Sequence, residues 1–199
     1  MRIPLSDSDF LFKDLSSSFQ AYCGRIEDAS EFEEIYQKIR KSNLKAAHIP
    51  YAFRVGEYTK SSDDGEPSGT GGKALLGLLD NCEADQTYLI VVRFFGGTKL
   101  GIPRLRRAFV SAGEGALSQM KWGIAKELDE YRLEVDYPTY EKLNRICKKR
   151  GFLVENEDFS ISVKLSLLGN GKIDTVLQEV GIIDIPPSTK VIRIIGEEA

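Results

Sequence analysis

A stretch in the first half of the chain combines carboxylates with glycines in a pattern typical of binding loops. It reads SDDGEPSGTGGK from Ser62 to Lys73. Glycines lose much conformational entropy when they are ordered, so a loop that only connects two elements would not need so many of them. The glycines lead into a helix that we expect to begin near Lys73, where free backbone N–H groups and the helix dipole favour an anion. The stretch is not a nucleotide P-loop, because the glycine spacing differs and Ala74 follows the lysine.

The carboxylates of this stretch allow two other interpretations. Asp63, Asp64 and Glu66 could hold a hard cation such as Mg²⁺ through their oxygens. Alternatively, they cap turns and pair with nearby arginines, so that the stretch is scaffold rather than site. The sequence leaves anion or partner binding, metal binding and a purely structural role open.

A second stretch concentrates positive charge. Residues 93–107 read RFFGGTKLGIPRLRR in a chain whose formal net charge is −3, so nucleic-acid binding would require a local patch like this one. Arginines bind phosphate oxygens through paired hydrogen bonds, and nearby aromatic rings could stack on unpaired bases. In the alternative interpretation, the arginines pair with the carboxylates of the first stretch and the rings belong to the core. The basic residues are Arg93, Lys99, Arg104, Arg106 and Arg107, and the rings are Tyr51, Phe53, Phe94 and Phe95.

Side chains for nucleophilic catalysis are scarce. His48 is the single histidine, and its place at the start of an expected strand favours a structural role. Ser68 and Thr70 lie among glycines, but no G-x-S-x-G elbow surrounds them. The remaining enzymatic hypothesis is a Mg²⁺-assisted hydrolase or phosphoryl-transfer protein that uses the DDGE carboxylates, with Lys73 or Arg93 stabilising charge.

Composition indicates an ordinary globular protein. Hydrophobic residues make up 42% and charged residues 29% of the 199 residues, as in typical folded domains. Cys23, Cys82 and Cys147 are too scattered for a disulfide framework or a zinc site, so we expect ordinary buried thiols. The N-terminal segment lacks the apolar run of a secretion signal, and apolar runs elsewhere are too short to span a bilayer. We therefore expect a cytoplasmic location and no membrane association.

Hydrophobic periodicity predicts one complete α+β unit in the first part of the chain. Ser30 followed by Glu33 is typical of a helix start, because each side chain can reach the other's backbone. Gly, Ser, Asp and Pro crowd residues 56–72, which indicates a long loop. The predicted elements are strands over 18–26, 48–55 and 87–94, the last nearly all apolar, and helices over 30–42, 75–79 and 104–119.

A second set of elements follows with its own periodicity. Residues 122–126 interrupt the pattern, and we place a domain boundary near Glu130. The order βαββαβ that follows is that of a ferredoxin-like split unit. The predicted elements are strands over 131–135, 152–155, 159–167 and 191–195, and helices over 140–149 and 173–180.

Taken together, the motifs resemble a known family. The strings HIPYAFRVG, DDGEPSGTGGK, VVRFFGGTKLG and RRAF follow one another within residues 18–117 as in the IMPACT/YigZ proteins. Residues 130–195 resemble, more weakly, the C-terminal domain that bacterial members append. The resemblance implies an α+β protein with an Impact-type, ribosomal-protein-like βα domain over 1–125 and a ferredoxin-like domain over 128–199.

The same resemblance implies a function in translation. Eukaryotic members regulate translation through protein contacts, and a nucleic-acid or ribosome role is inferred for bacterial members without an established enzymatic activity. We therefore expect a non-enzymatic protein that binds RNA, the ribosome or a translation-regulating protein and needs no cofactor, Mg²⁺ belonging to the enzymatic alternative. The binding residues implied by the family motif are His48, Tyr51, Arg54, Asp63, Asp64, Glu66, Thr70, Lys73, Arg93, Gly96, Gly97, Lys99 and Arg107. We add Arg104 to them from the basic stretch.

One position departs from the family pattern. Members usually carry further glycines after the GG-x-x-LG run, where this chain has Pro103 and Arg104. Proline lacks an N–H group, and arginine adds bulk where glycine would let a ligand approach the backbone. A ligand held against that loop would bind differently in this chain, or not at all.

Overall fold

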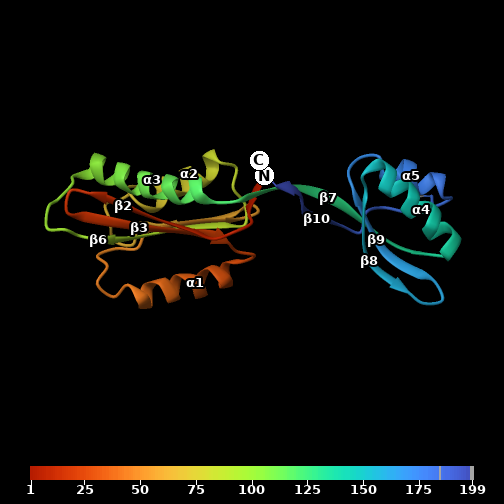
Figure 1. The fold of residues 1–199 in the computed structure, drawn as a ribbon, viewed down its shortest axis with the longest axis horizontal. Helices are drawn as coiled ribbons and strands as arrows, with labels where there is room; N and C mark the ends of the chain where they lie inside the picture. Colours follow the sequence, from red (N-terminus) through yellow and green to blue (C-terminus); the bar gives the residue numbers. More distant parts are fainter. Residues whose placement is uncertain (184, 198–199) are drawn as a thin grey trace. The chain divides into compact units, whose positions relative to one another are not determined.

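The computed structural model describes residues 1–183 and 185–197, and the chain divides into two compact units (Figure 1). The N-terminal unit comprises residues 1–125 together with the described residues from Ile194 onward. The C-terminal unit comprises Lys126–Arg193.

The N-terminal unit is built on a five-stranded antiparallel sheet with the spatial order β2-β3-β6-β4-β5. Helices α2 and α3 cover one face of the sheet, and α1 covers the other (Figure 1). The strands are β2 (Ser8–Asp14), β3 (Ser17–Arg25), β4 (Tyr51–Val55), β5 (Tyr58–Ser62) and β6 (Thr87–Phe94), and the helices are α1 (Ala29–Ser42), α2 (Gly72–Asn81) and α3 (Ile102–Gln119).

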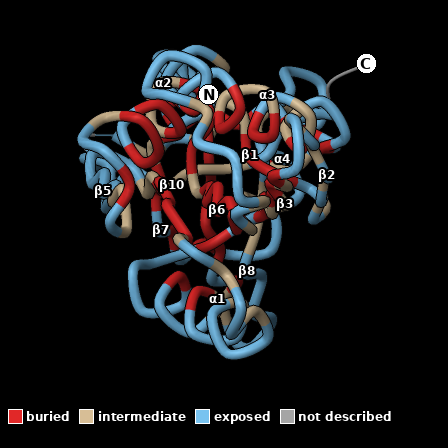
Figure 2. Tube along the Cα trace, turned by 90° about the vertical axis from the view of Figure 1, so that its left-hand side faces the viewer, coloured by how far each residue is buried: buried red, intermediate tan, exposed pale blue. Residues whose placement is uncertain are grey.

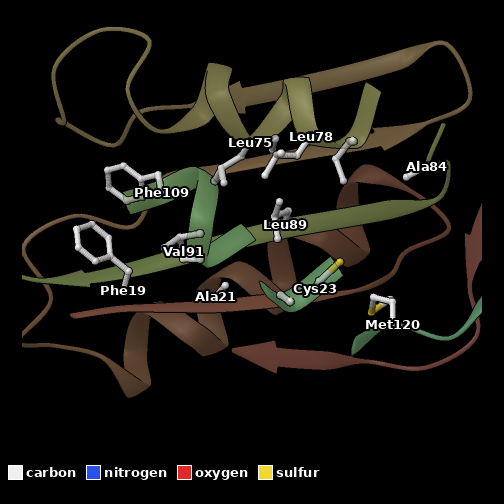
Figure 3. Close-up of a cluster of buried hydrophobic side chains, with 14 of the residues drawn as sticks. Phe19, Ala21, Cys23, Leu75, Leu78, Ala84, Leu89, Val91, Phe109 and Met120 are labelled. Carbon is white, nitrogen blue, oxygen red and sulfur yellow. The ribbon is translucent and has the colours of Figure 1, made fainter. Parts of the chain in front are cut away.

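Strand alternation distributes the apolar side chains of this sheet between two cores. Phe19 and Ala21 of β3 pack under α2 and α3 with Leu89 and Val91 of β6 (Figure 3). Residues from Thr87 to Arg93 are all buried, so the predicted nearly all-apolar central strand is confirmed (Figure 2). The core under α1 contains Ile26, Phe32, Tyr36, Ile49, Tyr51, Phe53, Tyr88, Ile90 and Val92.

Two strands of the five-stranded sheet lie where no strand was predicted from the sequence. Strand β2 occupies the N-terminal segment, and β5 lies within the predicted long loop over 56–72. Both are edge strands. Four of the five side chains of β5 are exposed, so the apolar alternation that marks a half-buried strand is missing there.

The first helix begins earlier than predicted. Asp28, not Ser30, is the N-cap, and its carboxylate accepts hydrogen bonds from the N–H groups of Ser30 and Glu31. The Glu31 carboxylate in turn accepts from the Glu27 N–H group at 2.7 Å. The capping aspartate and the glutamate three residues later therefore lie two residues before the predicted pair, and the glutamate binds the residue before the cap instead of the cap itself. The predicted end near Ser42 is confirmed.

The C-terminal unit has the ferredoxin-like order predicted from the sequence. Its sheet runs β10-β7-β9-β8, with β7 and β9 at the centre. Leu143 and Cys147 of α4 pack against Leu165 and Leu167 of β9 in its core. The elements are β7 (Trp122–Val135), α4 (Tyr137–Arg150), β8 (Leu153–Phe159), β9 (Val163–Gly169), α5 (Ile173–Glu179) and β10 (Thr189–Glu197).

We predicted that residues 122–126 interrupt the pattern of strands and helices. This prediction is wrong, because the segment is the first part of the long strand β7. Its first residues pair with β1 (Arg2–Pro4), with Trp122 opposite Pro4 and Ile124 opposite Arg2. Residues 122–124 are therefore a strand because they pair with the N-terminal segment, which is distant in the sequence, although their own hydrophobic pattern does not indicate a strand.

The cysteines are buried or partly buried, as expected from the sequence. Cys23 and Cys147 are buried and Cys82 is partly buried, all as free thiols, and burial raises the pKa of Cys147 to about 11. Within the described residues, no helix combines the length and the apolar character needed to cross a bilayer.

Candidate functional site

The two motif stretches meet at a buried ion pair. Arg93, near the C-terminal end of β6, donates from Nη1 to both carboxylate oxygens of Glu66 at 2.6 and 2.8 Å. The side chains of Arg93 and Glu66 are only 9% and 1% exposed. The guanidinium carbon also lies 5.8 Å from the ring centre of Phe19 and 5.6 Å from that of Phe95. This pair holds the glycine-rich segment 63–71, which we call the glycine loop, against the sheet.

Asp63 folds the glycine loop around its own carboxylate. Its Oδ2 accepts a hydrogen bond from the Gly69 N–H group at 2.8 Å, and its Oδ1 accepts from the N–H groups of Gly71 and Gly72 at 2.9 Å each. Gly71 and Gly72 are the N-cap and first residue of α2. The anion predicted for this helix terminus is therefore a carboxylate of the chain itself, which occupies the donors that an external anion would need.

Asp64 ties the glycine loop to the start of β4. Its Oδ2 accepts from the Ile49 N–H group at 2.7 Å, and its Oδ1 accepts from Arg40 of α1 at 3.4 Å. His48 Nδ1 lies 2.7 Å from the Asp64 carbonyl oxygen, so this ring nitrogen carries the proton and donates. Gly65 has a φ of +89°, and a Cβ there would stand 3.0 Å from the His48 ring. This contact with the glycine loop is what a structural role of His48 would require.

The three carboxylates of the DDGE motif do not converge on a common point. Glu66 binds Arg93, Asp63 binds glycine amides, and Asp64 binds Ile49 and Arg40. Over residues 1–183 and 185–197, no group of three or more His, Cys, Asp or Glu side chains could hold a metal ion. This geometry corresponds to the structural interpretation of the motif carboxylates.

The segment between β6 and α3, residues 95–101, which we call the β6–α3 loop, is fitted closely against the β2–β3 turn. A Cβ on Gly96 would stand 1.9 Å from the Ser16 carbonyl oxygen, and the Gly96 N–H group donates to Ser17 Oγ at 3.3 Å. Gly97 and Gly101 have φ values of +89° and +73°, a region that residues with a Cβ rarely adopt. The glycines of this loop therefore shape the backbone.

Replacing Gly96 with alanine should destabilise the N-terminal unit by about 1–3 kcal/mol, because the new Cβ must displace the backbone of Ser16. Gly77 of α2 is the matched control, since a Cβ there meets nothing within 4 Å. Gly77→Ala should stabilise by roughly 0.5–1 kcal/mol through helix propensity. Urea denaturation of both variants measures the two changes, and equal effects would contradict the close contact at Gly96.

Most cations around these loops are exposed and form no ion pair with a described residue. Arg104 is exposed as well but is paired, because its Nε and Nη2 donate to the Asp14 carboxylate, with the shortest contact at 2.6 Å. The hydrogen bonds from Arg104 and, to a smaller extent, the charge of Arg107 lower the pKa of Asp14. Phe95 is 48% exposed beside them. The exposed residues that form no ion pair within the described part of the chain are Lys73, Lys99, Arg106 and Arg107.

Other expected site residues are buried or are bound within the chain. Tyr51 and Phe53 are 9% and 1% exposed in the core under α1, so the expected stacking of bases on these rings has no accessible face. Thr70 is buried and donates from Oγ1 to the Pro67 carbonyl oxygen at 2.6 Å. Arg54 pairs with Asp80 of α2. Sequence reasoning missed Asp14 and Arg40, because they lie outside both motif stretches.

Comparison with known proteins agrees with this fold and motif arrangement. Residues 15–117 match the model of the Impact N-terminal domain. An IMPACT family member of Haemophilus influenzae is 30% identical over 156 residues, covering 76% of each chain. The IMPACT family member YvyE of Bacillus subtilis is 31% identical over 151 residues, covering 74% of this chain and 70% of the relative.

A solved structure extends the agreement to the whole fold. The crystal structure of a hypothetical protein superposes with a TM-score of 0.65 at 23% identity, covering 99% of this chain and 98% of the other. The protein is thus of the two-domain α+β class with a motif-bearing N-terminal sheet. The chain belongs to the IMPACT family.

Proposed function

We propose that this chain is a non-enzymatic binding protein whose N-terminal unit docks on RNA, most directly on ribosomal RNA, in the regulation of translation. The observation that supports this proposal is that, at one end of the sheet, the negative side chains are bound within the chain while several positive ones are exposed. The motif carboxylates are bound internally, whereas Lys73, Lys99, Arg106 and Arg107 remain exposed without ion-pair partners among the described residues. These four residues and Phe95 constitute what we call the basic surface.

The basic surface has the chemistry of a phosphate-backbone contact. Its cations come from the first turn of α2, from the second turn of α3 and from the β6–α3 loop, so they surround one end of the sheet. Positive charges that neutralise phosphates release counterions, which drives binding even for a chain of net charge −3. Phe95 adds an exposed ring on which a base could stack. The role in translation itself rests on family membership and on the resemblance described above.

The hydrolase alternative has less support. A Mg²⁺ site would require at least two of the DDGE carboxylates to turn toward one point. Each of them is held elsewhere by hydrogen bonds of 2.6 to 2.9 Å, and breaking the buried Glu66–Arg93 pair is costly.

We also propose that the protein is cytoplasmic and that its two domains comprise residues 1–125 and 128–199.

Cosedimentation with ribosomes and with bulk RNA across a salt series tests the proposal. The wild-type protein should bind saturably and more weakly as salt rises. The double variant Lys99→Ala/Arg107→Ala should bind at least roughly tenfold more weakly at low salt, and its logarithmic salt slope should be shallower by about 1–2, because two phosphate contacts are lost.

The control for this experiment is the double variant Lys41→Ala/Lys149→Ala. It removes two exposed positive charges from α1 and α4, so its net charge equals that of the test variant. It should bind as the wild type does. Equal losses in both double variants, or binding that does not respond to salt, would refute the basic surface as the site. Binding to ribosomes without binding to free RNA would instead indicate a ribosomal protein as partner.

A further inference from the structure

A groove in the N-terminal unit lies on the face of the sheet that carries α1. It is near the N-terminal end of β6, whereas Arg93 is near the C-terminal end of that strand. It has a volume of about 480 Å³ and runs between α1 and the strands β2 and β3. Its lining combines apolar and charged side chains. The lining residues include Asp7, Asp9, Tyr22, Arg25, Glu31, Ile35, Lys38, Ile39 and Tyr88.

The floor of this groove brings a carboxylate and a phenol together. Gly24 of β3 lies directly opposite Tyr88 of β6 in the sheet register. A Cβ on Gly24 would stand 2.1 Å from Asp7 Oδ1 and 2.9 Å from the Tyr88 hydroxyl oxygen. Both oxygens therefore converge on the space above this glycine. A side chain at position 24 would fill that space, which explains why glycine is needed there.

Neither oxygen is used by the fold. Tyr88 is only 7% exposed, yet within residues 1–183 and 185–197 its hydroxyl makes no hydrogen bond, and the Asp7 carboxylate has neither a hydrogen bond nor an ion pair. The Tyr88 hydroxyl is not sealed from solvent although its ring is buried, and Asp7 is an exposed residue, so both oxygens open onto the groove and a ligand can reach them. The unmatched Tyr88 hydroxyl, directed into a groove beside a free carboxylate, indicates a ligand that supplies hydrogen-bond donors.

The charges of the groove favour a cation. Asp7, Asp9 and Glu31 line it with negative charge, against the positive charges of Arg25 and Lys38. Arg25 is already bound to Gln86 and Glu27. Burial is the main cause that raises the pKa of Tyr88, and the charge of Asp7 adds to it, so the hydroxyl stays protonated beside that carboxylate.

The walls select a cation on an aliphatic stem. Ile35 and Ile39 of α1 and Tyr22 of β3 are partly exposed apolar side chains along the groove. Lysine and arginine bury their methylene stems against such surfaces while the head group finds acceptors. We propose that the groove between α1 and β2 binds a lysine or arginine side chain of a partner protein, with its head group at Asp7 and Tyr88 and its stem along Ile35 and Ile39.

This inference is independent of the basic surface and is tested on the full chain with defined peptides. The probes are Ac-Gly-Arg-Gly-NH2 and Ac-Gly-Lys-Gly-NH2, with Ac-Gly-citrulline-Gly-NH2 as the neutral analogue of the arginine peptide. Titrations followed by NMR of the isoleucine methyl groups should show saturable shifts at Ile35 and Ile39 with both cationic peptides. The citrulline peptide should bind at least roughly fivefold more weakly, because hydrogen bonds to charged groups are the stronger ones.

Variants locate the head group. Asp7→Asn should weaken binding of the arginine peptide roughly tenfold and Tyr88→Phe roughly fivefold, since each removes one acceptor. Lys38→Gln should strengthen binding about twofold by removing a like charge from the groove. Glu34→Gln is the control, because it removes an exposed carboxylate of α1 that does not line this groove. Equal shifts with the citrulline peptide, or equal losses in Asp7→Asn and Glu34→Gln, would overturn the proposal.

Discussion

Replacing Arg93 with methionine should lower the free energy of unfolding of the N-terminal unit by about 3–5 kcal/mol. The substitution leaves the Glu66 carboxylate, with a side chain 1% exposed, without its only ion-pair partner among the described residues. An unpaired charge in such a site has lost its hydration and gains nothing in return. Glu66→Leu should have a similar effect, because it strands the guanidinium instead.

The double variant Glu66→Leu/Arg93→Met separates a structural pair from a binding residue. Replacing both partners of a buried ion pair with apolar residues of similar volume is often nearly neutral. We expect the double variant to recover most of the lost stability and to retain salt-dependent RNA binding. Urea denaturation of the four proteins gives the coupling free energy of the pair. Additive losses, or loss of RNA binding in a stable double variant, would contradict this account.

Replacing Asp63 with alanine should cost roughly 2–4 kcal/mol and loosen the glycine loop. The carboxylate accepts hydrogen bonds from the N–H groups of Gly69, Gly71 and Gly72. It also provides negative charge at the N-terminus of α2, whose N-cap Gly71 has no side chain to do so. Hydrogen bonds to charged groups contribute about 1.5–3 kcal/mol each, less when they share one acceptor group.

Hydrogen exchange and denaturation together measure this effect. The amides of Gly69, Gly71 and Gly72 should exchange faster in Asp63→Ala, and Asp63→Asn should recover part of the protection through its remaining carbonyl oxygen. Glu57→Ala is the control, because it removes an exposed carboxylate from the β4–β5 turn. Unchanged exchange at the three glycines would show that the loop is held by other contacts.

These two predictions bear directly on how the family motif is understood. If Glu66, Arg93 and Asp63 act through stability, their substitution changes RNA binding only as far as it changes the folded fraction. Lys99 and Arg107 are exposed and should act in the opposite way, changing binding while leaving the free energy of unfolding nearly constant. Measuring stability and binding on the same variants distinguishes the two groups of residues.

The sequence alone determined the elements whose signals are local. The apolar run over 87–94 predicted β6, and the helical spacing over 104–119 predicted most of α3, which begins two residues earlier at Ile102. The motif strings also determined the family, since their order and spacing are properties of the chain itself. Edge strand β5 escaped prediction because four of its five side chains are exposed and leave no apolar pattern. Strand β2 does alternate half-buried and exposed side chains, but only Phe10, Leu11 and Phe12 among its seven residues are apolar.

Only the tertiary structure decided which charges pair. Glu66 and Arg93 are 27 residues apart, and Arg104 and Asp14 are 90 apart, so sheet register and loop packing bring them together. The same holds for Asp7 and Tyr88, whose side-chain oxygens approach each other above Gly24 of β3. The type of a residue determines which groups its side chain can bind. Whether that side chain is free to bind a ligand depends on partners that are distant in the sequence. The sequence therefore left open which motif arginines and carboxylates pair with one another, and the fold shows that Arg93 pairs with Glu66 whereas Asp63 and Asp64 bind backbone amides.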